Sequence, residues 1–283
     1  MRSLWKKLAA SLGAVLIASG VAGASFAPDL LYRLGQWSIR AATPSGLATE
    51  KVLNTPHFTI RYTTADAAMA SLVGQTAERA YAAVRAATGF APKTRIPITI
   101  YPSTQALSAS FGWGDARPSL GVYWMGEIRL LSPQAYWGDR SDLAEIYWSQ
   151  GPMVHEYTHL WIDETLRGHF PRWYTEGVAQ VMEARITGYV WTQSDATLSS
   201  PGQYRMEALN DDFDALPNTA LAYREAYAAA AYLMADPKRF AALQEQLRQG
   251  ASMQQALTKV WGFQSLDAFD AAWRQYAQQH GIT

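Results

Sequence analysis

The most informative part of this chain is Gly151-Pro-Met-Val-His-Glu-Tyr-Thr-His-Leu-Trp161. It contains His155, Glu156 and His159 in the order H-E-x-x-H, inside an apolar run that a helix would bury. Residues four apart lie on one face of a helix, so the two imidazoles can hold one metal ion together. The carboxylate of Glu156 is then placed to take a proton from a water molecule at that ion. The stretch therefore predicts a helix that supplies two metal ligands and a general base.

The composition is that of a folded protein without a charge bias. The chain has 283 residues, of which 49% are hydrophobic, so it can bury a full core. Lys and Arg total 24, as do Asp and Glu, which gives no reason to expect a nucleic-acid partner. The chain has no cysteine, which excludes disulfides, thiol catalysis and thiolate ligands. Any metal must therefore be held by His, Asp, Glu or water.

A catalytic zinc ion usually has three protein ligands and one water molecule, so the motif needs a third ligand. The three-histidine pattern of the metzincins requires a histidine and a glycine at positions where this chain has Thr165 and Ile162. His169, in the loop that follows, could line the cleft. Further on, the run Pro171-Arg-Trp-Tyr-Thr-Glu-Gly-Val-Ala179 predicts a second helix that contains Glu176. A short loop between two packed helices can bring this carboxylate beside the imidazoles.

The flanking patterns predict an α+β fold in residues 51–283. Residues 51–165 form an α/β half with a small mixed sheet, and residues 166–283 form a mainly helical half. Alternating apolar residues predict the strands, at 57–62, 96–101, 121–124 and 127–131. Helical periods predict the later helices, at 173–185, 221–234, 237–249, 252–260 and 265–279. We expect the segment 187–218 to be a long loop, which in proteins is usually functional or mobile.

Single residues set the limits of several elements. Met125-Gly126 joins two strands as a hairpin. Pro97 has no N–H to donate to a neighbouring strand. Either its strand, 96–101, lies at a sheet edge, or Pro97 lies at the start of that strand. An Ala-rich helix that covers the sheet begins with Thr64 as its N-cap and stops at Gly89.

The first 50 residues predict a targeting signal and a spacer. The basic residues Arg2, Lys6 and Lys7 precede an uncharged stretch, which is typical of exported proteins. Residues 1–28 are therefore either a signal peptide or an uncleaved membrane anchor, and residues 29–50 are a linker. Either alternative predicts an exported domain, membrane-anchored and facing outward, or periplasmic or secreted.

Together these motifs resemble those of the gluzincin zinc metallopeptidases, especially the peptidase MA-like group. The motifs that carry the resemblance are H-E-x-x-H, W-x-x-E-G-x-A, and the strands H-F-x-I-x-Y and I-x-I-Y, at 155–159, 173–179, 57–62 and 98–101. The resemblance covers most of the chain after residue 50 and implies a zincin-like fold. It also implies that His155, His159 and Glu176 bind one Zn²⁺ ion, with Glu156 as the general base.

The resemblance further implies an oxyanion-stabilising tyrosine and a residue that orients a ligand histidine. Tyr223 lies where the family has a helix that bears a tyrosine, and Tyr174 is the rival. Related enzymes place an acidic residue four positions after the ligand glutamate to orient a histidine, but this chain has Gln180 there. Glu183, two turns beyond Glu176, is the alternative.

We therefore expect a zinc-dependent metallopeptidase that hydrolyses peptide or protein substrates and binds no nucleic acid. Contact with the membrane is expected only through residues 1–28, if they are not cleaved. The strand within 127–132 is a candidate edge strand that pairs with an extended substrate. Two alternatives stay open: a membrane-associated binding or scaffold protein with a structural metal site, and a zinc hydrolase of non-peptide amides.

Overall fold

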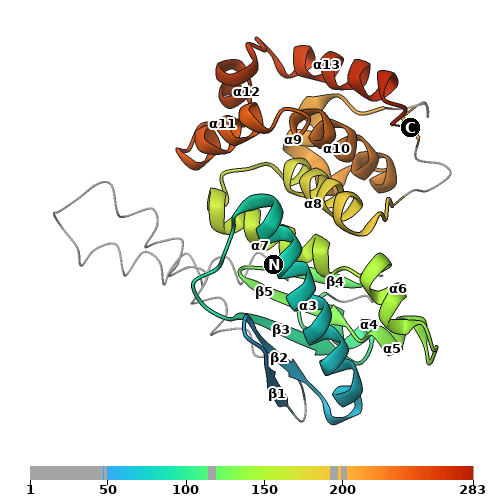
Figure 1. Cartoon of the computed structure of the whole chain (residues 1–283). Helices are drawn as coiled ribbons and strands as arrows, with labels where there is room; N and C mark the ends of the chain where they lie inside the picture. The colour runs from blue at the N-terminus through green and yellow to red at the C-terminus, as the bar shows by residue number, and fades with distance from the viewer. Residues whose placement is uncertain (1–46, 48–49, 114–118, 192–196, 199–202, 283) are drawn as a thin grey trace. The chain divides into compact units, whose positions relative to one another are not determined.

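The computed structural model describes residues 47, 50–113, 119–191, 197–198 and 203–282, all of which belong to one compact unit, Arg40–Thr283. The unit has the predicted α+β fold, with a small mixed sheet and a mainly helical C-terminal half (Figure 1). The predicted signal or anchor, 1–28, lies outside the described residues, as does the linker except for Leu47 and Glu50. No helix within the described ranges is long and apolar enough to cross a membrane.

The sheet in the described part of the chain has five strands in the order β1-β2-β3-β5-β4. The three inner strands run parallel, and the two edge strands, β1 and β4, are antiparallel to their neighbours. Four strands confirm predicted ones. The short, largely exposed β1 shows no burial pattern that would have predicted it. The strands are β1 (Lys51–Asn54), β2 (Phe58–Tyr62), β3 (Ile96–Tyr101), β4 (Gly121–Trp124) and β5 (Glu127–Leu131).

The strand order corrects two expectations about sheet edges. β3 is an interior strand, so the expectation that Pro97 places its strand at a sheet edge is wrong. Pro97 is the second residue of β3, and the pairing of β3 with β5 begins one residue later, at Ile98. β5 is also interior, so it is not the strand that can pair with a substrate. The hairpin turns through Met125 (φ 48°) and Gly126 (φ 81°), folds β4 back along β5, and leaves β4 at the edge.

The apolar face of the sheet packs on the Ala-rich helix α3 (Ala67–Thr88). Side chains such as Ile60, Ile98 and Ile128 are fully buried there, because alternate residues of a strand point to one face. A 3₁₀ turn, η1 (Thr64–Asp66), precedes α3, so the expectation that Thr64 caps the helix is wrong: Asp66 is the N-cap. The predicted stop at Gly89 is confirmed, with φ 74°.

Two helices, α7 (Met153–Leu166) and α8 (Arg172–Thr187), connect the halves of the fold. α7 contacts α3, β4 and α8, and α8 contacts α10 as well, so both helices are buried along most of their length. This burial is why the H-E-x-x-H stretch is apolar. The remaining helices are α4 (Thr104–Ala109), α5 (Pro133–Trp137), α6 (Leu143–Gln150), α9 (Met206–Asp212), η2 (Phe213–Ala215), α10 (Thr219–Leu233), α11 (Pro237–Arg248), α12 (Met253–Trp261) and α13 (Leu266–Gln279).

All five of the predicted later helices are present, whereas α5, α6 and α9 were not predicted. The segment 187–218 is therefore not one structureless loop, since its described part contains α9 and η2. α9 is short and buries only Met206 and Leu209, which is too few residues to show a helical period in the sequence.

α8 and α10 cross with almost no space between their backbones at Gly177. A Cβ atom on Gly177 would lie 2.1 Å from the carbonyl oxygen of Ala226 and 2.8 Å from the Cβ of Ala230. Only glycine fits there. The glycine of the W-x-x-E-G-x-A motif is thus required by helix packing, directly beside Glu176.

Candidate metal centre

α7 and α8 bring His155, His159 and Glu176 together. Each residue offers one ligand atom, and the three atoms lie within 4.8 Å of one another. Nε2 of His155 is 3.2 Å from Oε2 of Glu176, and Nε2 of His159 is 3.6 Å from Oε1. The histidines share a face of α7 because they are four residues apart, and the loop 167–171 turns the chain so that α8 presents Glu176 to that face. We call these three residues the metal cluster.

The far nitrogen of each imidazole faces a side chain of α8. Nδ1 of His159 is 2.7 Å from the hydroxyl of Thr175, and Nδ1 of His155 is 3.6 Å from a carboxylate oxygen of Glu183. Such partners fix the ring orientation of metal-binding histidines. The structure places Glu183, the predicted alternative, beside His155. The contact between Thr175 and His159 was not predicted from the sequence. The position of Thr175 directly before Glu176 was the one feature that could have indicated it.

Gln180 connects helices and does not contact a ligand histidine. Its amide nitrogen donates to the backbone carbonyl of Tyr223 at 3.0 Å and lies 3.4 Å from that of Glu176. The side chain therefore ties α8 to α10 at the level of the metal cluster.

The metal cluster fits a single metal ion. Metal–ligand bonds of about 2.0–2.2 Å in a tetrahedral site place the ligand atoms roughly 3.3–3.6 Å apart. The separations of 3.2 Å and 3.6 Å, each to a different oxygen of Glu176, are close to that spacing, and one ligand atom from each residue can be chosen so that all three lie within 4.8 Å. Among the described residues, this is the one group of three or more His, Asp or Glu side chains with such an arrangement.

The electrostatics of the cluster keep Glu176 ionised. Burial raises the pKa of Glu176, but the neighbouring Arg172, His159 and His155 outweigh burial and hold that pKa well below its usual range. Burial lowers the pKa of His159 to about 3, so this imidazole is neutral at physiological pH. Burial opposes protonation of His155 too, but its hydrogen bonds with Glu176 and Glu183 prevail and raise its pKa well above the usual value.

Glu156 lies on α7 and is held by the edge strand β4. Its Oε2 accepts a hydrogen bond of 2.6 Å from the backbone N–H of Tyr123. Burial raises the pKa of Glu156 to about 7, although the positive charge on His155 lowers it. The hydroxyl of Tyr123 also donates to Asp163 at 2.5 Å, so this residue contacts α7 at two points two turns apart. Sequence reasoning missed Tyr123, because nothing in a hairpin strand indicates which helix its outer edge meets.

The two candidate tyrosines lie in different surroundings. Tyr223 on α10 packs between Phe213 and Trp191, and burial together with the charge of Glu176 raises its pKa. The charges of Arg172 and Glu156 also affect this pKa, and the backbone carbonyl of Tyr223 accepts the hydrogen bond from Gln180, one turn after Glu176 on α8. Tyr174 is fully buried and stacks on Phe240 of α11 with a centroid distance of 6.3 Å. His169 is exposed in the loop before α8 and is not a member of the cluster.

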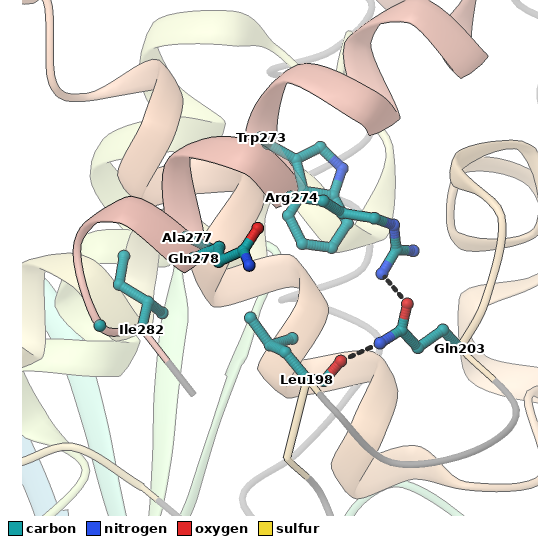
Figure 2. Close-up of a pocket in the computed structure, with 8 residues that line it drawn as sticks. Leu198, Gln203, Trp273, Arg274, Ala277, Gln278 and Ile282 are labelled. Atoms are coloured by element: carbon teal, nitrogen blue, oxygen red, sulfur yellow. Dashed lines mark hydrogen bonds between the residues drawn. The ribbon is translucent and has the colours of Figure 1, made fainter.

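A pocket of about 370 Å³ lies against the C-terminal end of α13 (Figure 2). Trp273 and Arg274 line it together with Leu198, Gln203 and the end of the chain. None of its lining residues belongs to the metal cluster.

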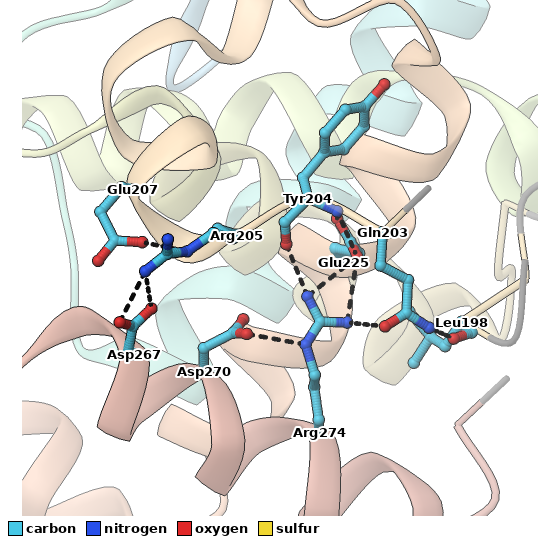
Figure 3. Close-up of polar contacts among 9 residues, drawn as sticks. All are labelled: Leu198, Gln203, Tyr204, Arg205, Glu207, Glu225, Asp267, Asp270 and Arg274. Atoms are coloured by element: carbon cyan, nitrogen blue, oxygen red, sulfur yellow. Dashed lines mark hydrogen bonds and ion pairs between the residues drawn. The ribbon is translucent and has the colours of Figure 1, made fainter. Parts of the chain in front are cut away.

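Next to this pocket, Arg274 binds the fully buried carboxylate of Glu225 at 3.2 Å (Figure 3). Arg274 also contacts Asp270 and the carbonyl of Tyr204, while the N–H of Tyr204 donates to Glu225. This network joins α10, α13 and the segment before α9.

A comparison with curated proteins found no match. A model of the Peptidase MA superfamily matches residues 76–279, a range that includes α7, α8 and the whole metal cluster. This confirms the family predicted from the H-E-x-x-H and W-x-x-E-G-x-A motifs. Members of the superfamily are usually metal-dependent, which agrees with the geometry of the cluster. The chain therefore belongs to the Peptidase MA superfamily and is a peptidase.

Proposed function

We propose that the protein is a zinc-dependent metallopeptidase in which His155, His159 and Glu176 bind zinc. The observation that carries the proposal is the convergence of two imidazole nitrogens and one carboxylate oxygen within 4.8 Å. Two histidines and one glutamate, without a thiolate, are a common ligand set of catalytic zinc. A zinc ion held there would supply Lewis-acid chemistry, polarising a peptide carbonyl and lowering the pKa of water.

Glu156 acts as the general base in this proposal. The N–H of Tyr123 holds Oε2 at 2.6 Å, which leaves Oε1 free to accept the proton of the attacking water. Glu156 then delivers that proton to the leaving nitrogen of the peptide. The fixed position of the carboxylate reduces the cost of orienting it for each proton transfer.

Tyr223 donates its hydroxyl hydrogen bond to the developing oxyanion. Its burial beside Glu176 and Arg172 supports this role, whereas Tyr174 packs into the core against α11. Gln180 donates a hydrogen bond of 3.0 Å to the backbone carbonyl of Tyr223, which ties Tyr223 on α10 to the helix that carries Glu176. A hydrogen-bond donor of this kind stabilises the transition state more than the ground state.

Metal removal and loss of the base test the proposal. We expect purified protein to contain one zinc ion per chain and to cleave peptides, and a chelator to abolish the cleavage. Glu156→Gln should retain zinc and lose cleavage by about 10²-fold or more, because the proton acceptor is gone. His155→Ala and Glu176→Ala should both lose zinc. Elemental analysis and a peptide-library assay measure these outcomes.

Matched variants control for nonspecific effects. Glu164→Gln changes a partly exposed carboxylate on the same helix, and His169→Ala removes an exposed histidine outside the cluster. Both should keep zinc and activity. Zinc bound without any chelator-sensitive turnover would instead indicate a binding protein with a structural metal site. Unchanged zinc content after loss of His155 or Glu176 would refute the ligand assignment.

We also propose that the domain acts outside the cytoplasm. Support comes from Arg2, Lys6 and Lys7 followed by the uncharged stretch to residue 28. Cell fractionation combined with N-terminal sequencing of the mature protein tests this, and distinguishes a cleaved signal peptide from a retained anchor. Recovery of intact protein from the cytoplasm alone would contradict the proposal.

A further inference from the structure

Arg172, the first residue of α8, lies at the boundary between the metal cluster and solvent. Its Nη2 is 2.7 Å from Oε1 of Glu176, one helical turn further on. The side chain of Arg172 is 48% exposed, whereas that of Glu176 is only 2% exposed. The guanidinium therefore contacts a proposed metal ligand on one side and is open to an incoming molecule on the other.

The other charged partner of Arg172 is weakly held. Nε lies 3.5 Å from a carboxylate oxygen of Asp214, whose side chain is 77% exposed. An exposed ion pair of this kind contributes little to stability, so the carboxylate of a substrate can replace Asp214. A guanidinium has five N–H donors in a planar fork, and a carboxylate accepts two of them at once.

Within the described ranges, Arg172 is the one Arg or Lys side chain that forms an ion pair with Glu176. A negatively charged group that enters the cluster therefore meets this one guanidinium.

We propose that Arg172 binds a carboxylate of the substrate, and that the enzyme prefers peptides with a negative charge beside the scissile bond. The carboxylate belongs to an acidic side chain or to a free C-terminus, since both present the same two oxygens. This specificity rests on the proposed peptidase function. Arg172 is a specificity-determining residue, distinct from the metal ligands and the general base.

The first test compares zinc-loaded wild type with Arg172→Gln on matched peptides. The peptides carry Asp or Asn at each position next to the scissile bond, and each is made with a free or an amidated C-terminus. Wild type should have a KM about 10- to 100-fold lower for the charged member of a pair, as expected for a charge-assisted hydrogen bond. Arg172→Gln should abolish this difference in KM. If the difference between Asp and Asn peptides disappears, the carboxylate belongs to an acidic side chain; if the difference between free and amidated peptides disappears, it belongs to the C-terminus.

The second test measures binding without turnover. In the Glu156→Gln background, calorimetry should show that Arg172→Gln weakens binding of the Asp peptide by a similar factor. The same change should alter the affinity for the Asn peptide by less than about threefold. Asp214→Asn should act in the opposite direction and tighten the Asp peptide, because it removes the competing carboxylate. Arg248→Gln, which removes an exposed guanidinium paired with Glu245, is the matched control and should change neither peptide.

The outcomes separate this proposal from the proposed function. If wild type cleaves no peptide, the peptidase proposal fails, and the calorimetry still decides whether Arg172 binds carboxylates. If cleavage occurs with equal KM for Asp and Asn peptides, the specificity proposal fails and the peptidase proposal stands. A loss of zinc with equal effects on all peptides would show that Arg172 only holds Glu176 in place.

Discussion

Tyr123 shows how one residue connects the edge strand to the helix that carries the motif. Its backbone N–H holds Glu156, and its hydroxyl holds Asp163 one heptad further along α7. Because the N–H belongs to the backbone, proline is the one substitution that removes it directly. The position of that N–H depends on the bond from the hydroxyl to Asp163, which keeps β4 in register with α7.

Tyr123→Phe should therefore lower turnover of peptides by roughly 10-fold while zinc content stays the same. The reason is that the hydroxyl bond to a carboxylate contributes about 1.5–3 kcal/mol, and without it Glu156 loses part of its orientation. Steady-state kinetics and elemental analysis measure the two effects. Tyr136→Phe, at a tyrosine that is 60% exposed, is the control and should change neither. Full activity of Tyr123→Phe would contradict this role.

The residues of the site divide into those that the sequence could predict and those that it could not. His155, His159 and Glu176 were predictable because helical spacing and one short loop are enough to bring them together. Thr175 and Arg172, which contact these ligands, and Tyr123, which contacts Glu156, were not predictable. Their contacts depend on helix rotation and on which strand lies at the sheet edge.

At the scale of elements, the contact between α8 and α10 depends on one missing side chain. Gly177 allows the carbonyl oxygen of Ala226 to approach to a distance that no Cβ atom could tolerate. Helix propensity alone favours alanine over glycine by about 1 kcal/mol, so the glycine is retained against local preference.

Gly177→Ala should destabilise the protein by about 1–3 kcal/mol, because the added methyl group forces the two backbones apart. Thermal unfolding measures the loss. Gly74→Ala on α3 is the matched control, since its Cβ would meet side-chain atoms and no backbone: those of Ile60, Thr55 and Leu53, at 3.1 Å, 3.2 Å and 3.8 Å. The free energy of unfolding of Gly74→Ala should differ from that of wild type by less than about 1 kcal/mol. Equal stability of the two variants would show that α8 and α10 can separate at little cost.

The types of the long elements were predictable, but their neighbours were not. Periodicity predicted the later helices and four strands, because each buries a continuous face. The order that places β4 at the edge and β5 inside depends on pairing between distant segments, and the hairpin sequence is compatible with either order. β1 and α9 escaped prediction because each buries too few residues to form a pattern.

At the scale of the whole molecule, the C-terminal helices are joined by a buried charge. Glu225 on α10 is fully buried, and burial raises its pKa to about 7 in spite of Arg274. A carboxyl group whose pKa is higher in the folded state binds its proton more tightly there than in the unfolded chain. Its contribution to stability is therefore complete below about pH 4.5 and is lost as the pH rises towards 7.

Glu225→Gln should remove the decrease in the free energy of unfolding that Glu225 causes between pH 4.5 and pH 7. The free energy of unfolding of wild type, relative to that of the variant, should fall on the order of 3 kcal/mol between pH 4.5 and pH 7.5. Chemical unfolding at a series of pH values measures it. Glu164→Gln, which changes a partly exposed carboxylate on α7, is the control and should leave the profile of wild type unaltered. A wild-type profile parallel to that of Glu225→Gln would contradict a raised pKa.

α8 supplies more of the metal centre than its single ligand suggests. Thr175 and Glu183 orient the two histidines, Arg172 contacts Glu176, and all of these side chains lie along one face of the helix. A small rotation of α8 would therefore disturb every ligand at the same time. Since Gly177 and Ala226 set that rotation, we expect that a substitution at this helix contact, which touches no ligand, would weaken binding of the proposed metal ion.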